Sequence, residues 1–548
     1  KDWQFHFYDT AAIDETVSAW KKVDLPHDWS IEGSFSEKHP AGVAGGALPG
    51  GFGVYRKVFR LPADAKNKNV RVEFDGVYRN SEVFINGFFV GKRPNGYISF
   101  HYDLTPYLRA DSNVLVVKVR NLPQPDSRWY TGSGIYRNVR LVVTNNVAVD
   151  HWGTFFTYTT TGNIPGAVQL NLTVRNTSKS LQTVRIETAI YGPDGKLVVA
   201  NALDSVELKD SLNDLKQHFT IHQPRLWYLD SPNLYKAVTK IIAGSQVDEY
   251  SSTFGMRNFD YNNNHLNGQP IEIRGVCMHH DLGALGAAVN SRAIERQLEI
   301  LKAMGCNAIR TAHNPPAPEL LELCDKMGFL VMVEAFDMWK KRKNRYDYHL
   351  DFDEWHKRDL EDMVKRDRNH PSVIWWSTGN EIREQFDSSG IRLTRELTRI
   401  VKKMDATRPV TAALTELDTT KNFMYKAHAL DVLGLNYNLD KYDQVAKNWG
   451  RYPVMAAETA SALATRGHYD MPSDSLRHWP ARGERTVSKG NADFTVSAYD
   501  HVAAYWGARH EDYWKGVKNN KSISGIFVWS GFDFLGEPVP YGWPARSS

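Results

Sequence analysis

The stretch "LKAMGCNAIRTAHNPPAPELLELCDKMGFLVMVEAFD" (301–337) contains two copies of one structural unit. "KAMG" at 302–305 and "DKMG" at 325–328 each end a helix-like segment in glycine, and an apolar run follows each of them. Glycine directly after a helix is a typical C-terminal signal, and a helix followed by a buried strand is the repeating unit of a parallel sheet. The two copies therefore predict an α/β architecture for this part of the chain.

The helix in front of the first copy has a predicted start, buried face and end. Asn290 precedes it as an N-cap, and Ile294, Leu298 and Leu301 recur at helical spacing. Gly305 follows it. These signals predict a helix that covers one face of the sheet.

From about residue 257 onward, eight apolar strands occur in series, mostly with helix-compatible stretches between them. An open, doubly wound sheet is the alternative arrangement, but no glycine-rich phosphate-binding fingerprint follows the first strand. Eight such units in roughly 290 residues favour a (β/α)8 barrel. The predicted strands are "IEIRGVCMHH" (271–280), "CNAIRTAHN" (306–314), "FLVMVEAFD" (329–337), "SVIWWSTGNE" (372–381), "PVTAAL" (409–414), "DVLGLNYN" (431–438), "PVMAAET" (453–459) and "GIFVWSGFDF" (525–534).

The chain before the barrel is rich in short strands. Residues 1–145 alternate apolar and polar residues, and the Asn86-Gly87 pair between two such runs is a strong hairpin signal. This region predicts a jelly-roll β-sandwich. Residues 146–256 continue in the same style with fewer aromatic residues, which predicts an immunoglobulin-like sandwich. The predicted domains are thus 1–145, 146–256 and a barrel over 257–548.

Composition excludes several classes of protein. The 548 residues are 42% hydrophobic and carry a net charge of +4, which is too small to indicate a nucleic-acid or membrane-surface partner. No run approaches the ~20 apolar residues of a membrane-spanning helix. The three cysteines, Cys277, Cys306 and Cys324, fit neither a zinc site nor a disulfide framework, so we expect buried free thiols.

Polar residues follow most of the predicted barrel strands, at the ends where the active sites of such barrels lie. Two of them are glutamates, Glu381 after strand four and Glu458 in strand seven, which face each other across a barrel. Two carboxylates roughly 5–5.5 Å apart carry out retaining glycoside hydrolysis, one protonated and the other ionised. Arg310 and Tyr437 would hold Glu458 ionised, and the aromatic run before Glu381 favours its protonated form.

Other reactions fit these residues less well. The histidines at the strand ends leave metal-dependent hydrolysis open as an alternative. Phosphoryl transfer would need phosphate-cradling loops, and the sequence contains none that we recognise. A carbohydrate-binding protein built on an inactive hydrolase scaffold is the alternative from a different class, although both carboxylates are present.

Several motifs occur in an order that resembles glycoside hydrolase family 2 along essentially the whole chain. Within that family the sequence is most similar to the β-galactosidases, which implies a jelly-roll domain, an immunoglobulin-like domain and a catalytic barrel. The motifs are "RWYTGSGIYRNV" (128–139), "RGVCMHHD" (274–281), "AIRTAHNPP" (308–316), "NHPSVIWWSTGNE" (369–381), "AAET" (456–459) and "FVWSGFDFLGEP" (527–538).

The resemblance implies a role for each candidate residue. Glu381 matches the acid/base and Glu458 the nucleophile, while Asn380 matches the residue that binds the sugar 2-hydroxyl. The activity implied is a retaining exo-β-galactosidase with a carbohydrate as its partner. The other residues matched to substrate binding, or to positioning the nucleophile, are Arg310, Tyr437, His279, His313, Trp529, Arg128 and Trp129.

Two departures from the family pattern bear on cofactors. Met338 stands where some β-galactosidases place a magnesium ligand, and Ser461 stands where they place a histidine that serves the 6-hydroxyl and a sodium site. We therefore expect no required cofactor and no protein-bound metal, although magnesium or sodium is compatible with the family, and recognition at C6 stays open. The Asn-x-Lys motif that β-glucuronidases carry after strand eight does not occur between that strand and Ser548. β-Glucuronidase and β-mannosidase are the alternative activities.

The chain ends with "GEPVPYGWPARSS" (536–548), directly after the last predicted strand. A barrel that lacks its last helix exposes apolar sheet surface, so we expect the natural protein to be longer. Enzymes that degrade polysaccharides are often exported, which favours a periplasmic or otherwise exported location, with the cytoplasm as the alternative. The oligomeric state is left open and includes a homo-oligomer.

Overall fold

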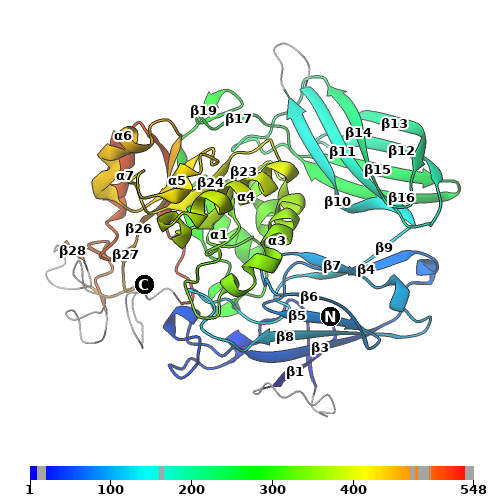
Figure 1. Ribbon diagram of the computed structural model, residues 1–548, viewed down its shortest axis with the longest axis horizontal. Helices are drawn as coiled ribbons and strands as arrows, with labels where there is room; N and C mark the ends of the chain where they lie inside the picture. The colour runs from blue at the N-terminus through cyan, green and yellow to red at the C-terminus, as the bar shows by residue number, and fades with distance from the viewer. Residues whose placement is uncertain are drawn as a thin grey trace.

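The computed structural model describes residues 1–8, 20–159, 166–469, 476–478, 493, 495–536 and 543. The end of the chain discussed above, apart from Gly536 and Trp543, lies outside these residues. The chain forms two β-sandwiches and a barrel (Figure 1), with the first sandwich (blue) below the barrel and the second (cyan to green) beside it. None of the described helices is long and apolar enough to cross a membrane.

The first sandwich packs two antiparallel sheets around one apolar core. The larger sheet has the order β2-β1-β3-β8-β5-β6, with β1 at Trp3–Tyr8, β2 at Lys21–Val23, β3 at Gly51–Phe59, β5 at Ser81–Ile85, β6 at Phe88–Arg93 and β8 at Asn113–Asn121. The smaller has the order β7-β4-β9, with β4 at Asn69–Phe74, β7 at Phe100–Asp103 and β9 at Val139–Thr144.

Turn chemistry and alternation explain this sandwich. Asn86 and Gly87 have φ of 52° and 89°, the left-handed pair that a tight hairpin between β5 and β6 requires, so the predicted turn is confirmed. Along β8 every second residue is buried, as expected for a strand with one face on the core.

The second sandwich contains seven long strands in two sheets around a second core. One sheet is β10-β11-β14, with β10 at Val147–Thr159, β11 at Gly166–Asn176 and β14 at Leu212–Ile221. The other is β13-β12-β15-β16, with β12 at Gln182–Tyr191, β13 at Leu197–Leu208, β15 at Tyr235–Ala243 and β16 at Gln246–Phe254. The strand number and the two-sheet packing suit the immunoglobulin-like class.

The third part is a closed barrel of eight parallel strands, and every strand predicted from the sequence belongs to it. Its strands are β20 (Ile273–Met278), β21 (Ala308–Thr311), β22 (Leu330–Glu334), β23 (Val373–Asn380), β24 (Val410–Leu414), β25 (Leu433–Asn436), β26 (Val454–Ala460) and β30 (Ile523–Trp529). The first strand pairs with the last, which closes the sheet and confirms the barrel over the open sheet.

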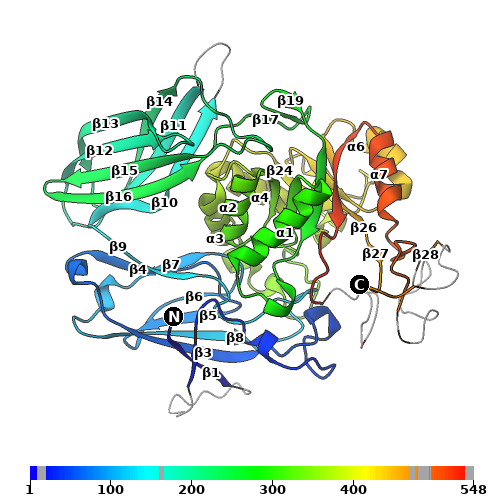
Figure 2. The same ribbon diagram turned by 180° about the vertical axis from the view of Figure 1, so that it is seen from behind.

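Helices surround the strands (Figure 2). They are α1 (Ser291–Met304), α2 (Pro318–Met327), α3 (Phe352–Asp367), α4 (Ser389–Met404), α5 (Phe423–Lys426), α6 (Val445–Trp449) and α7 (His510–Asn519). Short strands β17 (Phe259–Asp260), β18 (His265–Leu266) and β19 (Gln269–Pro270) precede the barrel. Three more, β27 (Ala462–Leu463), β28 (Arg477–His478) and β29 (Val502–Ala503), form a small sheet between β26 and α7 in the sequence.

The signals at the ends of α1 act as the sequence predicts. The side chain of Asn290 accepts a hydrogen bond from the Ala293 N–H, and Gly305 follows with φ of 95°. Gly328 ends α2 in the same left-handed conformation, and a Cβ there would lie 2.0 Å from the Leu229 carbonyl oxygen. Both glycines thus end their helices so that the chain can turn back into a strand.

One loop of the first sandwich is fastened to the barrel. The buried guanidinium of Arg137 donates to the main-chain oxygens of Pro315 and Pro316 at 2.9 and 3.0 Å. Asp28 accepts hydrogen bonds from the Tyr130 hydroxyl at 2.6 Å and from the Ala287 N–H at 2.9 Å. These bonds hold the loop that contains residues 128–137 at the mouth of the barrel.

Candidate active site

The carboxyl ends of the barrel strands and this loop enclose a pocket of about 890 Å³. Arg310 and Asn380 are fully buried beside it. The structure therefore brings the predicted site residues together at one rim, as the barrel architecture requires. The predicted residues that line the pocket are Arg128, Trp129, His279, His313, Glu381, Tyr437, Glu458 and Trp529.

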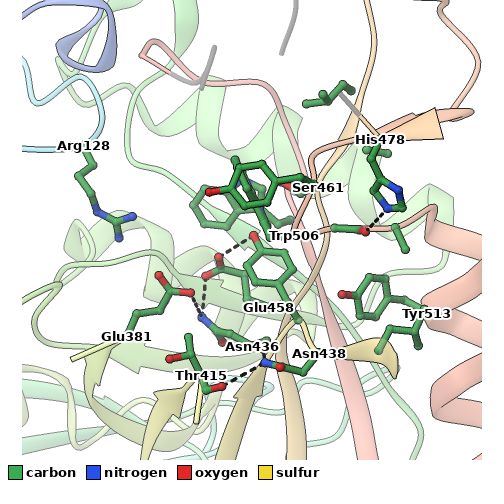
Figure 3. A pocket seen from close by; sticks show the side chains of 18 of the residues that line it. Arg128, Glu381, Thr415, Asn436, Asn438, Glu458, Ser461, His478, Trp506 and Tyr513 are labelled. Atoms are coloured by element: carbon green, nitrogen blue, oxygen red, sulfur yellow. Dashed lines mark hydrogen bonds between the residues drawn. The ribbon is translucent and has the colours of Figure 1, made fainter. Parts of the chain in front are cut away.

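Glu458, on β26 (Figure 3), accepts hydrogen bonds at both of its carboxylate oxygens. Its Oε1 accepts from the Tyr437 hydroxyl at 2.8 Å, and its Oε2 accepts from Nη1 of Arg310 at 2.9 Å. Burial and the neighbouring charge of Glu458 raise the pKa of Tyr437 well above its usual value, so the phenol stays protonated and donates. The carboxylate is thereby fixed in one orientation.

Glu381 stands directly after β23 and shares a donor with Glu458 (Figure 3). The Nδ2 of Asn436 lies 3.2 Å from Glu381 Oε1 and 3.3 Å from Glu458 Oε2. The two oxygens are therefore at most about 6.5 Å apart, the sum of those distances. Retaining pairs of carboxyl groups are roughly 5–5.5 Å apart and inverting pairs roughly 6.5–9.5 Å apart. The shared amide favours the retaining geometry.

The two tryptophans of β23 do not form the apolar surroundings expected for Glu381. Trp375 packs its ring against Phe259 and Phe527, and Trp376 donates from Nε1 to Asp405 at 2.9 Å. Successive residues of a strand point to opposite faces, so one ring faces the inside of the barrel and the other faces the helical layer. Among the described residues, the Glu381 carboxylate accepts a hydrogen bond from the polar side chain of Asn436.

A buried ion pair lies beneath the two carboxylates. Arg310 donates from Nη2 to Glu334 Oε1 at 2.9 Å, and the Ser377 hydroxyl donates to Glu334 Oε2 at 2.6 Å. Burial would raise the pKa of Glu334, but the charge of Arg310 and the hydrogen bonds from His313 and Ser377 outweigh burial and lower it. Glu334 therefore remains charged and orients Arg310 toward Glu458.

The first sandwich contributes Arg128 and Trp129 to the rim. Arg128 forms a two-bond ion pair with Asp337, with Nη2 at 2.6 Å and Nε at 3.0 Å from the carboxylate oxygens. Trp129 donates from Nε1 to the Tyr97 hydroxyl at 3.0 Å, and its ring centroid lies 5.0 Å from that of His279. Because the Arg128 guanidinium is already paired with Asp337, we assign it to holding Asp337 in place.

Aromatic rings form one wall of the pocket. Trp529 stacks on His313, with ring centroids 5.3 Å apart and planes 6° apart. His279 lies 3.9 Å from the ring of Phe534, and neither of its buried ring nitrogens has a hydrogen-bond partner among the described residues. Burial lowers the pKa of His279 well below its usual value, so the ring is neutral. Buried polar atoms normally have partners, and hydroxyl groups of a bound ligand would supply them.

A segment between β26 and α7 also lines the pocket. The Ala504 N–H donates to Ser461 O at 3.0 Å, and the Ala508 N–H donates to Ala460 O at 2.9 Å. These bonds place Tyr505 and Trp506 in the lining of the same pocket as Glu458 (Figure 3). The segment lies outside the barrel strands, so a search for polar residues at the strand ends does not identify it.

Two polar residues of the site had no predicted role. Asn436 ends β25 directly before Tyr437, at a strand end where polar site residues are expected, but the sequence does not show that its amide lies between the two glutamates. Lys343 lies in an irregular stretch after β22, where no periodicity or motif marks it. Its ammonium group lies 2.8 Å from both Asp337 Oδ1 and Asn380 O.

Metal ligands are not assembled in the part of the chain that the structure describes. There, no group of three or more histidine, cysteine, aspartate or glutamate side chains is arranged to hold an ion. Met338, at the position of the expected first magnesium ligand, is buried and has only a thioether to offer. These residues therefore do not fit the magnesium site of some family members.

Comparison with known proteins agrees with this three-part fold and with this site. Residues 260–533 match the TIM-barrel domain of the glycosyl hydrolases family 2, residues 148–257 match a second domain of that family, and residues 2–145 match its sugar-binding domain. A β-galactosidase of Bacteroides ovatus is 46% identical over the whole chain, which spans 68% of that protein. A putative β-glucuronidase of Formosa agariphila is 33% identical over 95% of the chain, which spans 50% of that protein. The crystal structure of a β-glycosidase from Bacteroides vulgatus, 34% identical, superposes on the whole chain with a TM-score of 0.86, and the chain covers 71% of it.

Proposed function

The chain belongs to glycoside hydrolase family 2, and from that premise we propose that it is a retaining exo-β-galactosidase acting on terminal β-galactosides of oligosaccharides or polysaccharides. The single observation that carries the mechanism is that Glu381 and Glu458 share the amide of Asn436. The choice of galactose is supported by the similarity, over the full length of the chain, to a protein named β-galactosidase.

The reaction proceeds by two displacements. In the first, Glu458 attacks the anomeric carbon while Glu381 donates a proton to the departing glycosidic oxygen, which leaves a covalent glycosyl-enzyme. In the second, Glu381 takes a proton from water, and the water oxygen displaces Glu458 from the same carbon. Each displacement inverts the anomeric centre, so the released sugar is the β anomer.

Several groups are available to hold the sugar. The amide of Asn380 has two N–H donors, and one of them is used on Asp337 at 3.1 Å, which leaves the other for the 2-hydroxyl. The unpaired ring nitrogens of His279 can accept from and donate to further hydroxyl groups. The ring of Trp529 offers an apolar face for the sugar ring.

The charge and the size of the pocket support a neutral sugar attached to a glycan. Among the described residues, the lining includes only two permanently cationic side chains, Arg128 and Lys441. Arg128 is paired with Asp337, and Lys441 donates to the neutral side chain of Asn438, while three carboxyl groups, Glu381, Asp440 and Glu458, also line the pocket. A pocket of about 890 Å³ is near the upper end of the range for small-ligand sites, so it has room for more than one sugar ring.

The second candidate activity is a β-glucuronidase, because several relatives carry that name. A panel of 4-nitrophenyl β-galactoside, β-glucuronide, β-mannoside and β-fucoside distinguishes the two. We expect the galactoside to be hydrolysed fastest, and faster turnover of the glucuronide would replace the galactosidase proposal.

The catalytic pair is tested with the preferred substrate from that panel. We expect Glu458→Gln to abolish turnover, because the amide cannot act as the nucleophile. Glu322→Gln, on the exposed side of α2, is the matched control and should retain full activity. Proton NMR of the first product formed should show the β anomer. An α product, or full activity of Glu458→Gln, would contradict the mechanism.

A further inference from the structure

Lys343 has a buried ammonium group that the mechanism above does not use. Its side chain is 7% exposed, and Nζ donates to the Asn380 carbonyl oxygen and to Asp337 Oδ1, both at 2.8 Å. Burial and the nearby charge of Arg128 lower the pKa of Lys343, while the negative charges of Asp337 and Glu381 act in the opposite direction. A buried charge that lies this close to two functional residues calls for an explanation.

The first of these bonds acts on the peptide group that joins Asn380 to Glu381. The carbonyl oxygen of this group accepts from Lys343, and its N–H donates to the Ala413 carbonyl oxygen at 2.8 Å. Because a peptide group is planar, fixing both ends fixes the orientation of the whole plane. The direction in which Glu381 leaves the backbone is set by that plane.

Glu381 needs such a support. Its φ is 45°, in the left-handed region that residues other than glycine seldom adopt. Such a conformation costs of order 1–3 kcal/mol and persists only when the surroundings hold it. The bonds from Lys343 and to Ala413 fix the peptide plane that precedes this strained residue.

The second bond of Lys343 acts on the side chain of Asn380 through Asp337. Asp337 Oδ1 accepts from Lys343 and from Asn380 Nδ2, the latter at 3.1 Å. Arg128 also donates to this carboxylate, at 2.6 Å to Oδ1 and at 3.0 Å to Oδ2. One ammonium group therefore orients the main chain of Asn380 directly and its amide indirectly.

We propose that Lys343 is the positioning residue for the proton-donating carboxylate, holding the 380–381 peptide so that Glu381 faces Glu458 across Asn436. Lys343 is not among the residues that line the pocket, so it acts through Glu381 and does not touch the sugar. The inference rests on the acid/base role proposed for Glu381. If Lys343 had only a structural role, neutralising Asp337, its loss would lower kcat/KM for every substrate by the same factor.

The test compares leaving groups that differ in their need for a proton. The substrates are the phenyl and 2,4-dinitrophenyl β-glycosides of the sugar that the unmodified enzyme prefers. Dinitrophenolate departs without protonation, whereas phenolate needs the acid, whose contribution is on the order of 100-fold or more. We expect Lys343→Met to lower kcat/KM for the phenyl glycoside about 100-fold and to change that for the dinitrophenyl glycoside by less than about fivefold.

Three further variants make the result decisive. Lys340→Met removes an exposed lysine of the same stretch, paired with Asp353, and should change neither rate. Lys343→Arg keeps a cation at the position and should recover part of the loss. If a thermal melt shows that Lys343→Met is unfolded, the ratio of the two kcat/KM losses, phenyl to dinitrophenyl, is taken from Lys343→Arg. Glu381→Gln gives the reference value of this ratio for an enzyme that has lost its acid.

Equal losses on both substrates, or no loss on either, would overturn the positioning role. A Glu381→Gln enzyme without leaving-group dependence would overturn the acid assignment and this inference together, while the sugar preference from the panel would stand.

Discussion

Removal of the Tyr437 hydroxyl tests how the nucleophile is held. Tyr437→Phe deletes the 2.8 Å bond to Glu458 Oε1 and leaves the 2.9 Å bond from Arg310 to Oε2 in place. A hydrogen bond to a charged group contributes roughly 1.5–3 kcal/mol, which corresponds to roughly 10- to 150-fold in rate. The larger part should appear in the second displacement, where Glu458 departs as a carboxylate and the phenol stabilises the returning charge.

Stopped-flow measurement with a 2,4-dinitrophenyl glycoside of the preferred sugar separates the two displacements. We expect Tyr437→Phe to show a burst of dinitrophenolate equal to the enzyme concentration, followed by slow turnover, and mass spectrometry should detect the glycosyl-enzyme. Tyr442→Phe is the matched control, because the buried Tyr442 hydroxyl has no hydrogen-bond partner among the described residues. A kcat within twofold of the unmodified enzyme, without a burst, would refute the reasoning.

Two predictions concern other parts of the molecule. Burial alone would raise the pKa of Glu73, but His151 and Arg71 outweigh it and lower the value to about 2. The carboxylate therefore adds about 3 kcal/mol of stability above its unfolded pKa of 4.5, which is lost as the pH falls from 4.5 to 2. In urea unfolding, Glu73→Gln should be less stable than the unmodified protein at pH 7 and nearly equal to it at pH 2, and a difference that does not depend on pH would contradict this. Trp506→Ala should raise KM about tenfold for a β-galactosyl disaccharide, through loss of ring stacking, and leave KM for methyl β-galactoside within twofold. Equal changes for both substrates would contradict a role beyond the first sugar.

Local chemistry explains why so much of the fold could be predicted. The Asn86-Gly87 turn, the Asn290 cap and the Gly305 stop each act within a few residues, and all three have the predicted geometry. The eight barrel strands are continuous apolar runs because both faces of a parallel sheet are covered, and each was identified from its own residues. The three cysteines are buried and free, as expected.

The same reasoning could not provide the directions of side chains or the contacts between distant segments. The tryptophans of β23 were expected around Glu381 because they are close in sequence, but the alternation of the strand points them elsewhere. The partners of Lys343 lie on two different strand ends, so no spacing along the chain predicts them. Main-chain hydrogen bonds to residues 460–461 place the segment that contains Trp506 in the pocket wall, and no spacing along the chain predicts these bonds.

The backbone itself links these observations. Glu381, Tyr437, Asn438, Ala460 and Ser461 all have φ between 45° and 70°, and each lies at or directly after the carboxyl end of a barrel strand. Strands run straight, so a side chain that must turn into the pocket needs a change of backbone direction at that end. The left-handed conformation provides the change at a cost of order 1–3 kcal/mol for each residue. Hydrogen bonds such as Lys343 to Asn380 O, and the Tyr437 N–H to Glu458 O at 2.7 Å, offset that cost. The buried polar network at this rim therefore orients the two carboxylates and also holds the strained backbone from which they project.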